Sequence, residues 1–249
     1  MIRIILSGAN GAMGKNVQAL VAEQPDLVIS CGVDHHPDPE AKFPQFNSFE
    51  AAGIEGDVII DFSHYSMVPS LVSFAAAAGT PAVICTTGLS DEIIADVEAK
   101  ASKVALFRSG NMSLGINLMI DLARRAAEVL GERYDIEIIE KHHNKKLDAP
   151  SGTALMIADG VNEAADGRYD YQHGRHGKDA KRMPKEIGIH AVRGGTIVGE
   201  HQILFAGTDE VLEIRHSAAS KKVFAEGAIK AARFLASAGP GLYSMKDIL

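Results

Sequence analysis

The sequence is poor in the residues that build disulfide frameworks and zinc sites. It has only two cysteines among 249 residues, Cys31 and Cys85, and both lie in short apolar runs typical of strands. Disulfide-rich domains and zinc modules need more cysteines at regular spacing. The adjacent His35 and His36 lack the surrounding ligand spacing of a metal site. We therefore expect neither a disulfide nor a metal site, and a reducing compartment.

Long apolar runs and an excess of positive charge are also missing. No apolar run approaches the roughly 20 residues that a membrane-spanning helix needs. The 25 basic residues are outnumbered by 32 acidic ones, and the formal net charge of -7 argues against nucleic-acid binding. The strand-like run 2–6 opens the sequence, with no signal peptide before it. We therefore expect a cytoplasmic protein that binds neither membranes nor nucleic acids.

The first part of the sequence alternates short apolar runs with segments of helical periodicity. Strand-like runs cover 2–6, 27–33, 57–62, 81–85 and 104–107. Helices are expected up to about residue 24, and over 67–78 and 91–102. Such alternation produces βαβ units around a parallel sheet. Together with a helix of the same type at 221–237, it predicts a Rossmann-like, doubly wound α/β domain formed by residues 1–113 and 221–249.

Glycines follow the first strand in a pattern typical of dinucleotide-binding turns. Gly8, Gly11 and Gly14 give G-x-x-G-x-x-G, with Asn10 where the usual motif has its second glycine. This pattern alone is weak, but a strand precedes it and a helix follows. Asp34 ends the second strand 20 positions beyond Gly14, where these folds place the carboxylate that binds a ribose. We therefore favour cofactor binding over a purely structural turn.

Ligands of parallel sheets bind beyond the carboxyl ends of the strands. We therefore expect the loops that follow the strands, at 8–14, 34–36, 62–66, 85–88 and 109–112, to share one rim. The residues predicted to contact the cofactor are Gly8, Ala9, Asn10, Gly11, Ala12, Met13, Asp34, Cys85, Thr86, Thr87, Ser109, Gly110, Asn111 and Met112.

The pattern changes after residue 113. A long helix is expected at 116–130, an alternating strand at 135–140 and a second helix at 153–164. The strands expected at 187–192, 200–205 and 210–216 follow one another so closely that they should pair antiparallel. Residues 166–186 have little periodicity and are either an anion-binding segment or a mobile surface loop. Residues 114–220 thus predict a smaller α+β domain on a mixed or antiparallel sheet.

Residues 140–153, Glu-Lys-His-His-Asn-Lys-Lys-Leu-Asp-Ala-Pro-Ser-Gly-Thr, carry most of the chemistry. Imidazoles and ammonium groups precede a capped helix start, and helix N-termini attract anions. His142, His143 or Lys146 can protonate a substrate that has received a hydride. The Ser-Gly-Thr turn offers donors for a carboxylate. These residues alone indicate a nicotinamide-dependent reductase of a small carboxylic acid.

The same segment reads E-x-H-H-x-x-K-x-D-x-P-S-G-T and closely resembles the signature of the dihydrodipicolinate reductase family. The resemblance continues through nearly the whole chain, at 8–14, 86–88, 111–115, 198–201 and 216–224. It implies reduction of 4-hydroxy-tetrahydrodipicolinate to tetrahydrodipicolinate in diaminopimelate and lysine biosynthesis, with NADH and/or NADPH as cofactor. It also implies a homotetramer formed through the second domain.

The resemblance assigns roles to individual residues. It implies that His142 is the catalytic acid/base and Lys146 the proton donor. His143 would contact the substrate, and the turn formed by Ser151, Gly152 and Thr153 would hold one of its carboxylates.

Three positions depart from the family pattern. Lys145 precedes the catalytic lysine, so the spacing to the Asp-Ala-Pro-Ser segment selects Lys146. Cys85 stands where the family often has glycine, and Lys221 stands where some relatives have arginine, which leaves the role of Lys221 open.

Two other classes of function fit parts of the sequence. A non-catalytic redox sensor would keep the glycine turn, but it has no need for His142 together with Lys146. Another two-domain dehydrogenase acting through a thioester would need a nucleophilic cysteine, and neither cysteine is placed like one. A sugar oxidoreductase would lack the Pro-Ser-Gly-Thr turn.

Overall fold

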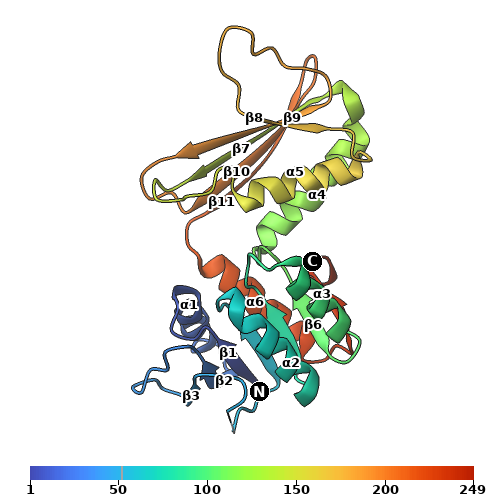
Figure 1. The fold of residues 1–249 in the computed structure, drawn as a ribbon. Coiled ribbons are helices and arrows are strands. Elements are labelled where there is room, and N and C mark those ends of the chain that lie inside the picture. Colours follow the sequence, from blue (N-terminus) through green and yellow to red (C-terminus); the bar gives the residue numbers. More distant parts are fainter. Residues whose placement is uncertain (52) are drawn as a thin grey trace. The chain divides into compact units, whose positions relative to one another are not determined.

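The computed structural model describes residues 1–51 and 53–249, which divide into two compact units. The first unit contains Met1–Leu114 and Lys221–Leu249, and the second contains Gly115–Ser220 (Figure 1). No helix in the described ranges is long and apolar enough to cross a membrane.

The first unit is built on a seven-stranded parallel sheet. Its strands are β1 (Ile2–Ser7), β2 (Leu27–Val33), β3 (Gln45–Phe46), β4 (Val58–Asp61), β5 (Ala82–Ile84), β6 (Ala105–Arg108) and β12 (Gly241–Tyr243). Their order is β12-β6-β5-β4-β1-β2-β3. The chain moves outward from β1 to β2 and β3, and then returns to β4 on the other side of β1. The crevice at such a switch point is where open α/β sheets bind ligands.

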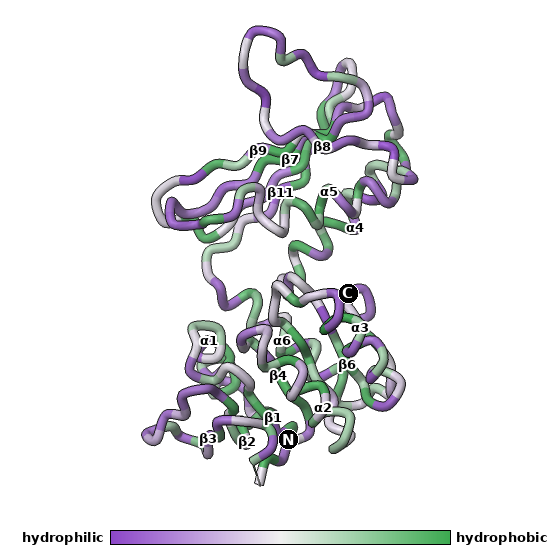
Figure 2. The backbone as a smooth tube through the Cα atoms, in the orientation of Figure 1, coloured by the Kyte–Doolittle hydropathy of each residue, from purple (hydrophilic) through white to green (hydrophobic). Residues whose placement is uncertain are grey.

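Helices cover both faces of this sheet (Figure 1). The helices α1 (Ala12–Val21) and α6 (Lys222–Leu235) pack in one core cluster, and α2 (Val68–Ala78) and α3 (Asp91–Lys100) in another. Successive side chains of β1 alternate between them, because Ile4 lies in the first cluster and Ile5 in the second. Figure 2 shows the hydrophobic colouring along the central strands. The predicted doubly wound α/β fold is confirmed.

The second unit is a five-stranded mixed sheet with two helices. The strands are β7 (Asp135–His142), β8 (Asp170–His173), β9 (Glu186–Arg193), β10 (Gly199–Ala206) and β11 (Val211–Ala218), in the order β11-β10-β7-β9-β8. The helices α4 (Leu114–Leu130) and α5 (Gly152–Ala164) share one core cluster with the fully buried Ile138, Ile203 and Phe205. One face of the sheet is therefore covered by helices, and the mixed sheet is confirmed.

Several sequence-based expectations for pairing and for short strands were wrong. The strand at 187–192 does not pair with the next strand, because β7 lies between β9 and β10 and pairs parallel with β9. Only β10 and β11 form the expected antiparallel neighbours. Short spacing brings strand ends close together, whereas burial of side chains on a common face selects the partner.

Three strands, β3, β8 and β12, were missed because each has only two to four residues and little periodicity. The strand β8 lies inside the segment 166–186 and pairs parallel with β9. The sequence also allows a short helix near 48–52, but residues 48–51 form turns and bends, and residue 52 lies outside the described residues.

Helix α6 packs closely against the backbone of residue 112 at Gly227. A Cβ atom there would overlap the carbonyl oxygen of Met112. Alanine favours helices by about 1 kcal/mol over glycine, but overpacking against backbone costs about 1–3 kcal/mol or more. We therefore expect Gly227→Ala to lower the free energy of unfolding, measured by urea denaturation.

Gly239→Ala is the matched control, because a Cβ at Gly239 meets no atom within 4 Å. Its urea midpoint should match that of the parent chain. Equal midpoints for both variants would show that α6 can move away from residue 112 without cost.

Candidate functional site

The glycine turn of the first unit depends on two positions without a side chain. Gly8 has a φ of 73°, and a Cβ there would lie 2.5 Å from the carbonyl oxygen of Phe62. A Cβ on Gly14 would overlap the carbonyl oxygens of Gly8 and Ala9. The turn therefore packs directly against both the loop after β4 and the start of α1. The first turn of α1 carries no acidic side chain, which leaves the positive end of this helix open to an anion.

Asn10 explains why a polar residue replaces the second glycine of the usual motif. Its side chain exchanges two hydrogen bonds with Gln45, at 2.8 and 3.0 Å, and donates a third to the carbonyl oxygen of His36 at 2.7 Å. Its backbone N–H donates to Asp34 Oδ2 at 2.9 Å, and the N–H of His36 donates to Asp34 Oδ1 at 3.1 Å. The Asp34 carboxylate is thus oriented by the protein itself.

The loops around Asp34 line a pocket of ≈ 440 Å³. The lining residues are Gly8, Asn10, Gly11, Val33, Asp34, His35, His36, Phe62, Ser63, His64 and Met67. This confirms the predicted common rim for three of the five loops, at 8–14, 34–36 and 62–66. Among these lining residues there is no lysine or arginine.

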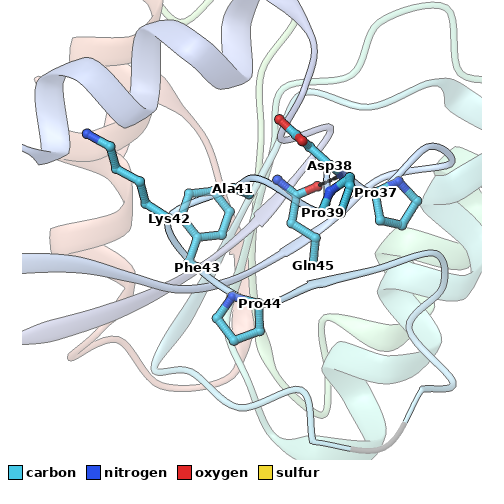
Figure 3. A pocket seen from close by; sticks show the side chains of 8 residues that line it. All are labelled: Pro37, Asp38, Pro39, Ala41, Lys42, Phe43, Pro44 and Gln45. Carbon is cyan, nitrogen blue, oxygen red and sulfur yellow. Dashed lines mark hydrogen bonds between the residues drawn. The ribbon is translucent and has the colours of Figure 1, made fainter.

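The lysines nearest in sequence to this turn and to Asp34 line a neighbouring hollow instead. Lys15 and Lys42 share it with Asn10 and Gln45. Figure 3 shows the side chains that line an adjoining pocket, where the Lys42 side chain extends away from Asp38 and Gln45. Asp38 joins the hydrogen bonds between Asn10 and Gln45, because its N–H donates to Gln45 Oε1 at 2.8 Å.

Thr86 joins a fourth loop to this rim. Its hydroxyl donates to Asp61 Oδ2 at 2.6 Å and lies 3.0 Å from the carbonyl oxygen of Ser63. Asp61 is fully buried at the end of β4, and this burial raises its pKa. Thr86 therefore connects the loop 85–88 to the loop 62–66.

The other predicted cofactor residues differ in exposure. The side chains of Ala9, Cys85 and Met112 are buried in the hydrophobic core, so only their backbone is suited to contact a ligand. Asn111 is also buried. Gly11, Ala12, Thr87 and Gly110 are exposed, and Met13 and Ser109 are half-buried.

In the second unit, strand register gathers the polar side chains. Glu140 and His142 are two residues apart on β7, so they point to the same, helix-covered face. His201 on β10 lies opposite Glu140, and Arg193 on β9 lies opposite His142. Three strands thus contribute to one polar cluster at the end of a buried sheet face.

Glu140 is the centre of this cluster and is fully buried. Arg193 donates to both carboxylate oxygens at 2.7 Å, and Ser151 N–H donates to Oε1 at 2.9 Å. Nδ1 of His142 lies 2.7 Å from Oε2. Burial alone would raise the pKa of Glu140, but the hydrogen bonds from Arg193, His142 and Ser151 outweigh it and hold that pKa below its usual value. The carboxylate is therefore ionised at neutral pH.

Ser151 has a structural role in addition to its predicted place in the substrate site. Its hydroxyl caps α5 by accepting from Ala154 N–H at 3.2 Å, and it lies 3.1 Å from Nε2 of His201. Burial, and then the nearby His142, lowers the pKa of His201 to about 4, so that ring is neutral at neutral pH. At the same helix start, Gly152 is exposed and Thr153 is half-buried.

Lys146 and Lys145 have different surroundings. Nζ of Lys146 lies 2.8 Å from Asp148 Oδ1, and its side chain is 22% exposed. The neighbouring Lys145 is exposed. The Lys146 ammonium lowers the pKa of Asp148. Lys146 N–H also donates to the carbonyl oxygen of His143, a half-buried residue, which makes this segment a turn.

The structure therefore brings His142 and Ser151 together around Glu140, which sequence reasoning did not assign to the site. The sequence-based prediction of the site also missed Arg193 and His201. The two-residue spacing of Glu140 and His142 in an alternating strand was an available signal for Glu140. No group of three or more His, Cys, Asp or Glu residues within the described ranges is arranged to hold a metal ion.

Known families and proteins match both units of the chain. Residues 2–112 match the model of the N-terminal part of dihydrodipicolinate reductase, and residues 115–249 match that of its C-terminal part. The chain is 52% identical to the 4-hydroxy-tetrahydrodipicolinate reductase of Caldanaerobacter subterraneus subsp. tengcongensis, over 100% of this chain and 98% of that protein. It is 45% identical to the reductase of the same name from Clostridium botulinum, with the same coverage.

Solved structures show the same fold. The dipicolinate-bound dihydrodipicolinate reductase from Paenisporosarcina sp. TG-14 superposes with a TM-score of 0.84 at 26% identity, over 100% of both chains. The diaminopimelate dehydrogenase of C. glutamicum has a TM-score of 0.59 at 15% identity, over 100% of this chain and 94% of that one, which shows similarity of fold alone. Matches across both units, at up to 52% identity over the full length, show that this chain belongs to the dihydrodipicolinate reductase family.

Proposed function

We propose that this chain reduces 4-hydroxy-tetrahydrodipicolinate to tetrahydrodipicolinate and water, with a hydride from NADH or NADPH and a proton, in diaminopimelate and lysine biosynthesis. The observation that carries the proposal is that the segment 140–153 folds into one hydrogen-bonded cluster. The full-length relatives of this chain are named 4-hydroxy-tetrahydrodipicolinate reductase. A redox sensor or a sugar dehydrogenase has no use for this cluster. The free cysteines are buried, which suits an enzyme of the reducing cytoplasm.

The two units would have different roles in the reaction. Residues 1–113 and 221–249 would bind the dinucleotide, and residues 114–220 would bind the substrate and other subunits. The first assignment is supported by the pocket at the switch point of the parallel sheet. The second is supported by the cluster of titratable side chains on β7, β9 and β10.

The residues of the glycine turn fit a dinucleotide. Gly8 and Gly14 keep side chains out of the turn, and the backbone N–H groups at the start of α1 suit a pyrophosphate. Asp34 retains lone pairs on both oxygens for ribose hydroxyls. The bound cofactor supplies a hydride. Thr87, Ser109 and Gly110 complete the proposed contacts on the rim, together with the backbone at Cys85, Thr86, Asn111 and Met112.

The substrate site would be formed by the loop and helix after β7. The start of α5, at the exposed Gly152 and the half-buried Thr153, would hold a carboxylate with His143 beside it. His142 and Lys146 would hold the protons that neutralise the negative charge left by hydride transfer. Lys146 is free to exchange Asp148 for a substrate group, because this ion pair is partly exposed.

The proton-transfer roles of His142 and Lys146 can be tested directly. His142→Gln and Lys146→Ala should each lower kcat by roughly a hundredfold or more, because general acids contribute about this factor. The assay follows oxidation of NADH in the presence of the product of a dihydrodipicolinate synthase. Binding of NADH alone should hardly change, since these side chains belong to the substrate site.

Lys145→Ala is the matched control for the lysine, because Lys145 is the exposed neighbour. It should retain most of the activity. Near-normal turnover of both His142→Gln and Lys146→Ala would refute the assigned roles, and no turnover by the parent chain would refute the proposed function itself.

The surroundings of Asp34 predict the cofactor preference. A 2′-phosphate would meet the Asp34 carboxylate, and the lining of this pocket provides His35 and His36 but no lysine or arginine. We therefore expect both cofactors to work, with a kcat/KM for NADH equal to or above that for NADPH at pH 7.5. A tenfold preference for NADPH at pH 7.5 would contradict this prediction.

The sheet face of the second unit that the helices leave open predicts self-association. Ile139 and Leu204 are half-buried there, and Val192 is 45% exposed. Because such a face gains stability when it is covered, we propose a closed homo-oligomer, which the family resemblance makes a tetramer. Light scattering at micromolar concentration should give four times the chain mass of 26.5 kDa. A particle of one chain mass would refute it.

A further inference from the structure

We propose that Glu140, fixed by Arg193 and by the backbone of Ser151, is the positioning residue that sets the tautomer and the orientation of His142. This inference rests on the proposed function, because it concerns how His142 is prepared for proton transfer. It adds Glu140 and Arg193 to the functional residues of the site. Glu140 itself would not contact the substrate, since its side chain is fully buried.

The tautomer follows from the hydrogen-bond inventory of the carboxylate. An ionised carboxylate only accepts hydrogen bonds, so its 2.7 Å contact with His142 requires the hydrogen to be on Nδ1. Both oxygens are fully engaged, because Arg193 donates to each and Ser151 N–H donates to Oε1. Glu140 therefore cannot rotate away, and Nε2 becomes the nitrogen of His142 that can gain and lose the proton.

The neighbouring backbone leaves room beside this nitrogen. A Cβ on Gly199 would lie 3.2 Å from Nε2 of His142, which is closer than most side-chain contacts. Glycine at this position keeps the Nε2 edge of the ring uncrowded. On another side the ring of His201 packs edge-on, with its centroid 5.2 Å from that of His142. Contacts on several sides thus fix the plane of the His142 ring.

Arg193 balances the charge of the arrangement. A buried carboxylate beside a single imidazole would strongly favour the imidazolium form. The two hydrogen bonds from Arg193 offset the negative charge of Glu140 beside the ring. Arg193 also donates to the carbonyl oxygen of Asp148 at 2.6 Å, which fixes the loop that carries Lys146.

Glu140 from β7 and His201 from β10 contact His142. Arg193 pairs with Glu140 from the position on β9 opposite His142, and Lys146 in the following loop acts electrostatically on His201. His201 is neutral at neutral pH and Lys146 is paired with Asp148. Changing Glu140 or Arg193 should therefore move the titration of His142 in opposite directions, which a purely structural role of the pair would not do.

The experiment compares Glu140→Gln, Glu140→Asp and Arg193→Gln with the parent chain. Nitrogen-15 NMR of the histidine rings reads the tautomer and the titration midpoint, and His142→Gln identifies the signal. Glu140→Gln should lower the midpoint by roughly one pH unit, because an anion beside the ring favours its charged form. Arg193→Gln should raise the midpoint. Glu140→Asp should give a midpoint between that of Glu140→Gln and that of the parent chain.

The same variants give a kinetic readout. Glu140→Gln should lower kcat by roughly tenfold or more with a smaller change in KM, because a misplaced or wrongly protonated histidine impairs transfer rather than binding. The descending limb of the kcat/KM profile against pH should move to lower pH with the NMR midpoint. Glu200→Gln is the matched control, since Glu200 pairs with Lys141 and Arg215 near the same end of the sheet.

The NMR arm needs no substrate, so it separates the two proposals. An unmoved tautomer and midpoint in folded Glu140→Gln and Arg193→Gln would overturn the positioning role while the reductase activity stands. An inactive parent chain with the expected NMR shifts would refute the proposed function and leave the positioning of His142 intact. If Glu140→Gln does not fold, Glu140→Asp and Arg193→Gln decide the question by the direction of their shifts.

Discussion

The polar cluster of the second unit depends on one buried interaction, the ion pair of Glu140 and Arg193. A carboxylate without exposure to water is costly unless it is fully paired. Here the bidentate contact with Arg193 ties β7 to β9, and the bond from Ser151 N–H closes the loop between β7 and α5. The remaining acceptor site goes to His142. The same contacts that make the charge tolerable therefore also orient the imidazole.

In the first unit, close packing of the backbone rather than a buried charge shapes the site. Gly8 and Gly14 allow the turn after β1 to touch the loop after β4 and the start of α1, where any side chain would collide. Asn10 then links this turn to Gln45 and Asp34 through hydrogen bonds at 2.8 to 3.0 Å. The pocket walls are thus held by contacts within the protein, and a ligand would meet a largely preformed surface.

The sequence predicted the elements better than their partners. Alternation and helical periodicity located the long strands and helices, because these patterns are local properties of the chain. Short strands such as β3 carry too few residues for a period to be visible. The neighbours of β9 could not be found from loop length, since the residues that pair between β7 and β9 are 51 positions apart in the chain. Only the common burial of side chains under α4 and α5 selects that pairing.

The amino-acid sequence by itself determined the fold class, the glycine turn with Asp34, and the segment 140–153 with its resemblance to a reductase family. Each rests on residues near one another in the chain. Only the tertiary structure decided that Arg193 neutralises Glu140, that Ser151 caps α5 beside His201, and that Lys15 and Lys42 line a hollow different from that of Asp34. Those facts depend on strand register and loop packing between distant segments, which no local pattern of residues specifies.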